Sequence, residues 1–93
     1  MVNGVAAENL IWYNLNMILI DVRTKEEYDA GHVDGAVLHD IVDMKQGIFP
    51  NIDKNEGITL YCESGNRSMM AKSIMEKAGF KNVVDAGSIE NLR

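Results

Sequence analysis

The sequence predicts an α/β fold, in which short parallel strands pack between helices. Residues 17–22 and 58–61 are short apolar runs of the kind found in strands buried on both faces. Residues 68–78 repeat apolar side chains at helical spacing. Because strands alternate with helices along the chain, we expect a parallel sheet covered on both faces, in a three-layer arrangement.

The composition indicates a single globular domain over residues 1–93. Hydrophobic residues make up 46% of the chain and charged residues 25%, which is ordinary for a folded protein. The net charge of −5 disfavours binding to nucleic acid or to an anionic membrane surface through a basic face. The longest apolar run, residues 17–20, is too short to span a bilayer. We expect a cytoplasmic monomer, or a periplasmic one if an export signal has been removed.

The first half of the chain contains two helix signals. Residues 1–16 form a lead-in segment in which Ala6–Tyr13 has part of an apolar helix face. After the strand at 17–22, Thr24 and Glu27 have the spacing of a capping box, and Gly31 ends the short helix that they begin.

A turn, a strand and a second short helix are expected next. Residues 32–36 predict a turn that leads into a brief strand at Val37–Leu38. Asp40 is a candidate N-cap for a short helix through Met44. Residues 47–57, which hold the one proline and several Asn and Asp residues, predict a surface loop.

The second half begins with the strand at 58–61, which runs directly into Cys62. The helix over residues 68–78 has an apolar face and ends at Gly79. A last strand is expected at 82–85, followed by a turn at 86–88. The apolar face of the helix consists of Ala71, Ile74, Met75 and Ala78.

The segment between the 58–61 strand and this helix has the features of a reactive cysteine loop. Ligands of parallel sheets gather at the carboxyl ends of strands, and a tight loop that enters a helix points successive N–H groups at one place. A thiol at that place loses its proton more easily, so Cys62 is a candidate nucleophile. A small buried apolar residue is the alternative interpretation of a lone cysteine. The loop reads Cys62, Glu63, Ser64, Gly65, Asn66, Arg67 and Ser68.

The other loop residues suit an anion site. Gly65 permits a positive φ, and Asn66 tolerates one better than most residues. The guanidinium of Arg67 is a cation suited to an oxyanion such as thiosulfate or sulfite, and Ser68 is a candidate cap for the helix. Because Cys62 is the one cysteine, an internal disulfide and a multi-cysteine metal site are excluded.

Three segments in order resemble the rhodanese-like domain family over residues 17–87. The resemblance implies about five parallel strands with helices on both faces, and a Cys62 that carries a sulfane sulfur as a persulfide. The compact form is most similar to the small bacterial thiosulfate sulfurtransferases, including the phage-shock type. The three segments are Asp21-Val22-Arg23 with Glu27 and Tyr28, Gly31–Ala36, and Tyr61–Ser68.

The resemblance also assigns supporting residues. Asp21 and Arg23 would support the active-site region, with Glu27 as a partner for Arg23. Three positions depart from the family's usual pattern: Asp34 stands where many relatives have proline, the glycine-rich segment after the last strand is reduced to Gly87-Ser88, and Glu63 places a negative charge beside the nucleophile.

We therefore expect a sulfurtransferase without cofactor or metal. Sulfur would pass from thiosulfate or a persulfide donor through Cys62 to a thiol or cyanide, with thioredoxin and glutathione as candidate acceptors. A phosphatase or arsenate reductase is disfavoured because only four residues separate Cys62 from Arg67. A catalytically idle binding module is the other alternative. His32 and His39 lack further ligands at metal spacing and are expected to make structural hydrogen bonds.

Overall fold

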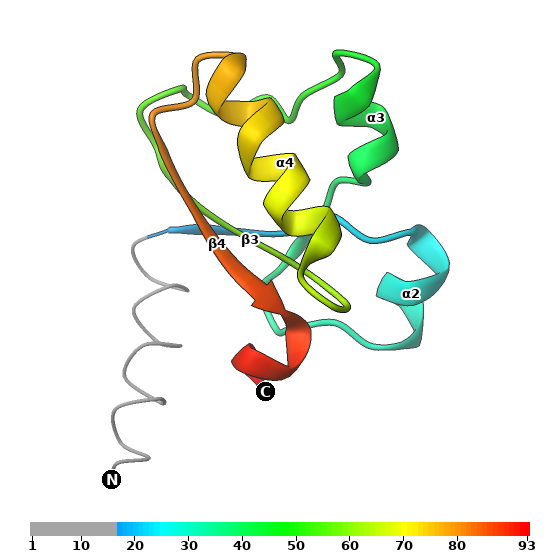
Figure 1. The fold of residues 1–93 in the computed structure, drawn as a ribbon. Coiled ribbons are helices and arrows are strands. Elements are labelled where there is room, and N and C mark those ends of the chain that lie inside the picture. The colour runs from blue at the N-terminus through cyan, green and yellow to red at the C-terminus, as the bar shows by residue number, and fades with distance from the viewer. Residues whose placement is uncertain (1–16) are drawn as a thin grey trace, which may run out of the picture.

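The protein is described by a computed structural model over residues 17–93 (Figure 1). The expected helix at 6–13 and the rest of the lead-in segment 1–16 lie outside the described residues. Within the described part, no helix is long and apolar enough to cross a membrane.

A parallel sheet forms the centre of the molecule, which confirms the α/β prediction. Its strand order is β2-β1-β3-β4, and all neighbouring pairs are parallel. The described residues thus contribute four strands, against about five expected. The strands are β1 (Ile18–Asp21), β2 (Val37–Leu38), β3 (Gly57–Cys62) and β4 (Asn82–Ser88).

Two helices, α2 (Lys25–Ala30) and α3 (Ile41–Lys45), start at the predicted caps. Thr24 and Glu27 form a complete capping box at the start of α2, and Gly31 ends that helix. The Asp40 side chain accepts a hydrogen bond from the N–H of Val42 and caps α3. The helices are α2 (Lys25–Ala30), α3 (Ile41–Lys45), α4 (Asn66–Lys77) and the 3₁₀ helix η1 (Ile89–Leu92).

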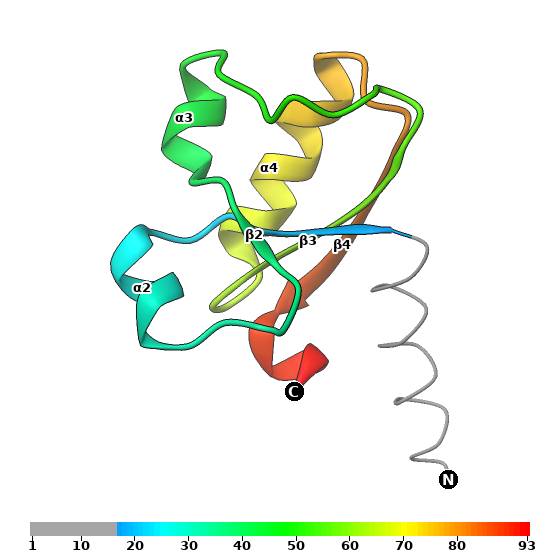
Figure 2. The same cartoon turned by 180° about the vertical axis from the view of Figure 1, so that it is seen from behind.

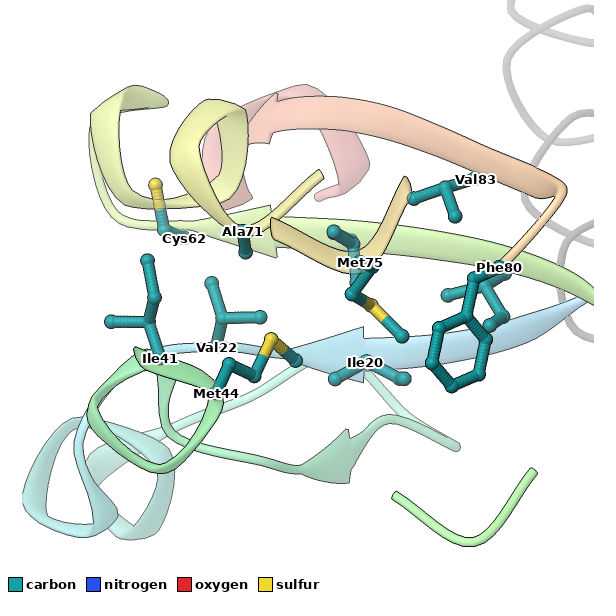
Figure 3. Packing of buried hydrophobic residues seen from close by; sticks show 11 residues of the cluster. Ile20, Val22, Ile41, Met44, Cys62, Ala71, Met75, Phe80 and Val83 are labelled. Atoms are coloured by element: carbon teal, nitrogen blue, oxygen red, sulfur yellow. The ribbon is translucent and has the colours of Figure 1, made fainter. Parts of the chain in front are cut away.

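The two faces of the sheet bury separate apolar clusters. Because side chains alternate along a strand, Leu60 and Cys62 point to one face and Tyr61 to the other. The first face is covered by α3 and α4, and the second by η1 (Figures 1 and 2). Figure 3 shows the first cluster, with Cys62 at one end and Phe80 at the other.

Among the predicted boundaries that differ from the structure, two bear on the surroundings of Cys62. The last strand does not end at Asp85, because its pairing with β3 continues until Ser88 lies opposite Cys62. A register shift between Leu60 and Tyr61 accommodates the extra residue in β4. The long helix begins at Asn66 instead of Ser68, so its amino end starts within the cysteine loop.

Candidate active site around Cys62

Cys62 is the last residue of β3 and faces the amino end of α4. Its side chain is fully buried and packs in the apolar cluster that includes Ile41 and Ala71. The sulfur is turned away from Ile41 (Figure 3). The Cys62 side chain therefore packs against hydrocarbon on one side, and its sulfur atom contacts the loop that follows β3.

Hydrogen-bond donors of this loop converge on the sulfur. The N–H of Gly65 donates to Cys62 Sγ at 2.9 Å, and the N–H of Ser68 donates at 3.3 Å. The thiol in turn donates to the Ser68 hydroxyl oxygen at 3.4 Å. Gly65 has a φ of +101°, as the sequence predicted for a glycine in this tight loop.

These donors outweigh the effect of burial on the thiol. Burial alone raises the pKa of Cys62, because it disfavours the charged thiolate. The Ser68 hydroxyl and the N–H groups of Ser68, Gly65 and Ser64 lower that pKa by stabilising the thiolate. The net result is a Cys62 pKa below the ordinary value of a cysteine, so the loop favours a nucleophilic thiolate.

Ser68 does not cap α4, contrary to the sequence prediction. The N-cap position is Gly65, which has no side chain to cap with, and Ser68 is buried in the first turn of α4. The Ser68 hydroxyl lies within reach of the carbonyl oxygens of Gly65 and Gly87, at 3.2 and 3.4 Å. Its hydroxyl therefore serves the cysteine sulfur and the loop instead of the helix terminus.

Arg67 and Arg23 have partners different from those expected. Arg67 forms a two-pronged ion pair with Glu27 of α2, with N–O distances of 2.7 and 2.9 Å. Glu27 was predicted to pair with Arg23, and that prediction was wrong. The bond to Arg67 lowers the pKa of Glu27 to about 2, which keeps the pair charged.

Arg23 instead lies at the centre of a buried polar cluster on the other face. Its guanidinium donates to both carboxylate oxygens of Asp21 and, at 2.7 Å, to the carbonyl of Gly31. The Tyr61 hydroxyl donates to Asp21 Oδ2 at 2.8 Å. The buried charges are thus paired and hydrogen-bonded, as burial of ions requires.

The same arginine reaches the cysteine loop. Arg23 Nη1 donates to Glu63 Oε1 at 2.9 Å, while the Glu63 side chain remains about half exposed. The carboxylate of Glu63, which follows Cys62 in the sequence, is therefore paired with the Arg23 guanidinium. The remaining loop residues, Ser64 and Asn66, are exposed.

Ser88 was not predicted as a site residue, yet it contacts the loop. Its hydroxyl donates to the Glu63 carbonyl at 2.7 Å from the end of β4. The backbone of β4 also lies close to the loop at Gly65. A Cβ atom added to Gly65 would lie 3.7 Å from Gly87 Cα. The signal in the sequence was the pair Gly87-Ser88, but only the register of β4 against β3 brings it to the loop.

The histidines take part in local structure. His32 Nδ1 lies 2.8 Å from the carbonyl oxygen of Tyr28, and the His32 ring stacks on the Tyr28 ring. His39 Nε2 lies 2.9 Å from the carbonyl oxygen of Ile48. In residues 17–93, no group of three His, Cys, Asp or Glu side chains is arranged to hold a metal ion.

Comparisons with known proteins agree with this arrangement. The rhodanese-like domain family matches residues 5–91. The chain is 35% identical over 74 residues to the thiosulfate sulfurtransferase PspE of Escherichia coli K12, covering 78% of this chain and 71% of PspE. It is 33% identical over 87 residues to a tRNA uridine(34) hydroxylase of Buchnera aphidicola, covering 86% of this chain but only 28% of that protein.

A solved structure, described as a rhodanese with anions from E. coli, superposes with a TM-score of 0.73. It is 34% identical in sequence, and the match covers 81% of this chain and 89% of that one. With the parallel sheet, the buried cysteine at the end of β3 and the loop amides directed at its sulfur, these matches establish that the chain belongs to the rhodanese-like domain family of sulfurtransferases.

Proposed function

We propose that this protein is an active sulfurtransferase in which Cys62 receives a sulfane sulfur and passes it to an acceptor thiol or to cyanide. The observation that carries the proposal is the convergence of the Gly65 N–H and the Ser68 N–H on one buried sulfur, which also lies 3.4 Å from the Ser68 hydroxyl oxygen. A cysteine that served only as a core residue would not need these donors.

The first half-reaction forms a persulfide on Cys62. With a persulfide donor, the Cys62 thiolate attacks the outer sulfur of R–S–SH, the new S–S bond forms as the donor's S–S bond breaks, and RS⁻ leaves. With thiosulfate, the thiolate takes the outer sulfur and sulfite leaves with its two negative charges. Neither step needs a general base when the attacking group is the thiolate that the Gly65 and Ser68 N–H groups stabilise.

The second half-reaction returns the free thiolate. An acceptor thiolate attacks the outer sulfur of the Cys62 persulfide, the S–S bond at Cys62 breaks, and the acceptor leaves as a persulfide. With cyanide, the product is thiocyanate. The loop N–H groups again stabilise the negative charge on Cys62 as it forms, in the manner of an oxyanion hole. Thioredoxin and glutathione are the candidate biological acceptors.

The charges around the loop favour a donor that carries little negative charge. Asp21 and Glu63 share the single cation of Arg23, and Arg67 is balanced by Glu27. These three carboxylates and two guanidiniums leave one negative charge, to which the thiolate adds another. A thiosulfate dianion is repelled more strongly by this surplus than a persulfide with at most one charge on its sulfurs, so we propose a persulfide donor.

Two other functions are less well supported. A cysteine phosphatase or arsenate reductase would need its loop arginine to bind a tetrahedral oxyanion, and Arg67 is engaged by Glu27 through two hydrogen bonds. An idle binding module would have no use for donors that lower the pKa of Cys62.

Intact-mass spectrometry tests the proposal directly. Reduced protein treated with thiosulfate or cysteine persulfide should gain one sulfur atom, located on Cys62, and should lose it on addition of cyanide with release of thiocyanate. Cys62→Ser is the matched control; it should fold and gain no sulfur. Wild-type protein that gains no sulfur from either donor contradicts the proposal, as does Cys62→Ser with undiminished transfer.

The proposed donor is tested by neutralising Glu63. Glu63→Gln should raise kcat/KM for thiosulfate about tenfold and raise it for cysteine persulfide about threefold or less, since the dianion feels the lost charge twice. Glu76→Gln removes the same charge near the far end of α4 and should change neither value. An equal response of the two donors to Glu63→Gln would contradict the preference for persulfide.

A further inference from the structure

One hydroxyl group joins the end of β4 to the cysteine loop. Ser88 lies opposite Cys62 in the parallel pairing of β3 and β4. Its Oγ donates to the Glu63 carbonyl at 2.7 Å and accepts the N–H of Glu90 at 3.1 Å, which caps η1. The hydroxyl therefore donates its single proton to the loop and accepts, with a lone pair, a hydrogen bond from η1.

The bond to the Glu63 carbonyl fixes the direction of the next N–H group. The carbonyl of Glu63 and the N–H of Ser64 belong to one planar trans peptide and point in nearly opposite directions. With the carbonyl held on Ser88, the Ser64 N–H is turned away from β4. The chain continues from this fixed peptide to Gly65, whose N–H donates to Cys62 Sγ at 2.9 Å.

Loss of the Ser88 hydroxyl would leave this peptide unanchored from the β4 side. The Ser64 side chain is exposed, so the anchor that remains is the ion pair between the Glu63 carboxylate and Arg23, which holds the Glu63 side chain and not its carbonyl. If the peptide rotated, the Gly65 N–H that follows it would be displaced from the sulfur. The displacement would remove a favourable interaction with the thiolate.

We propose that Ser88 is a positioning residue for Cys62: its hydroxyl holds the Glu63–Ser64 peptide and, through it, the loop whose Gly65 N–H donates to the sulfur. The inference deepens the proposed sulfurtransferase function and rests on it for its biological meaning. Its physical content, however, is the ionisation of one thiol, which can be measured without any sulfur donor.

Titration of the Cys62 Cβ signal by NMR tests the inference. Because the chain has a single cysteine, protein labelled with ¹³C-cysteine gives one signal whose pH dependence reports the thiol pKa. Ser88→Val should raise that pKa and reduce the thiolate fraction at neutral pH by about threefold to tenfold. Ser88→Thr has nearly the same shape and keeps the hydroxyl, so it should titrate like the wild type.

A control separates positioning from loosening of η1. Leu92→Ala weakens the packing of η1 on the second apolar cluster without touching the loop, and it should leave the Cys62 pKa unchanged. The inference is overturned if folded Ser88→Val titrates like Ser88→Thr, or if Leu92→Ala gives the same pKa shift.

The outcome is independent of the mass-spectrometry test. A wild-type protein that never forms a persulfide would refute the proposed function and leave the pKa comparison intact. An unshifted pKa in Ser88→Val would refute the role of Ser88 and leave the function standing. A loss of kcat in Ser88→Val that Ser88→Thr restores would support both.

Discussion

Tyr61 and Cys62 are consecutive residues of β3 with equally buried side chains, yet their ionisation is shifted in opposite directions. Burial raises the pKa of the Tyr61 hydroxyl to about 12, and the hydrogen bond to Asp21 favours the neutral form further. Burial also acts to raise the pKa of Cys62, but the donors of the loop and of the first turn of α4 reverse the shift.

The difference shows that the surrounding hydrogen-bond donors, and not burial alone, set the chemistry at this end of the sheet. Adjacent residues of a strand point to opposite faces. The Tyr61 hydroxyl therefore donates a hydrogen bond to the Asp21 carboxylate, whereas the Cys62 sulfur accepts hydrogen bonds from N–H groups. A structural residue and a candidate nucleophile follow each other directly in the sequence for this reason.

Removal of Arg23 should have the largest effect on stability, because it disrupts the buried polar cluster that contains Tyr61 and Asp21. Arg23→Met leaves the buried carboxylate of Asp21 without its cation, so the free energy of unfolding should fall by about 3–5 kcal/mol. Urea denaturation followed by circular dichroism measures the loss. Arg23→Lys retains a charge and should lose less, which keeps the test usable if Arg23→Met does not fold.

Lys25→Met is the control for the arginine variants. Its ion pair with Asp29 is exposed on α2, and such pairs add little to stability. Equal destabilisation by Arg23→Met and Lys25→Met would contradict the importance assigned to the buried cluster.

Tyr61→Phe should have the next largest effect. The change removes a donor to Asp21 and the acceptor of the Val33 N–H, which leaves that buried N–H without a partner. We expect a loss of about 1–3 kcal/mol in the free energy of unfolding. Tyr28→Phe removes a half-buried hydroxyl bonded to the Ala36 carbonyl and should cost less.

The same variant tests whether the two faces act independently. Because Tyr61 and Cys62 face opposite sides, Tyr61→Phe should leave the Cys62 thiol pKa unchanged, as measured on the ¹³C-labelled cysteine. A shift comparable to that expected from Ser88→Val would contradict the separation of the two faces.

The Glu27–Arg67 pair should give the smallest effect on stability, and one that depends on pH. The pKa of Glu27 is lowered from the ordinary 4.5 to about 2, so its contribution is fully present above pH 4.5 and is lost as the pH falls through 2. Because both side chains are about one-third exposed, Glu27→Gln should cost only about 1 kcal/mol at pH 7.

Paired denaturation curves of wild type and Glu27→Gln from pH 7 to pH 2 measure this contribution. The stability difference should shrink as the pH approaches 2, and a constant difference would contradict the charged pair. The pair also bears on donor binding through its charges. Glu27→Gln removes a negative charge beside the loop and should lower KM for thiosulfate, whereas Arg67→Ala removes a positive charge and should raise it.

The sequence predicted those features that depend on neighbouring residues. Thr24, Glu27 and Asp40 lie within the caps that they form, and Gly65 lies in the turn that requires its positive φ. The apolar character of residues 58–61 was enough to predict a buried strand that ends at Cys62.

The errors concern contacts between distant segments. Arg67 and Glu27 are 40 residues apart, and their pairing depends on how α2 lies against the cysteine loop. Arg23 pairs with Asp21 and Glu63 in the structure. From the linear sequence alone, these two carboxylates and Glu27 were equally possible partners. The extension of β4 to Ser88, and with it the hydrogen bond to the loop, follows from pairing with β3 and not from local preference.

Titration of Tyr61 and Cys62 in the same wild-type sample tests whether the loop donors outweigh burial at Cys62 and not at Tyr61. Selective ¹³C labelling of tyrosine and cysteine reports both groups by NMR, with Tyr61→Phe used to assign the tyrosine signal. We expect a Cys62 thiol that ionises below the ordinary cysteine pKa and a Tyr61 hydroxyl that ionises near pH 12. A Cys62 thiol that ionises at or above the ordinary cysteine value would contradict this expectation.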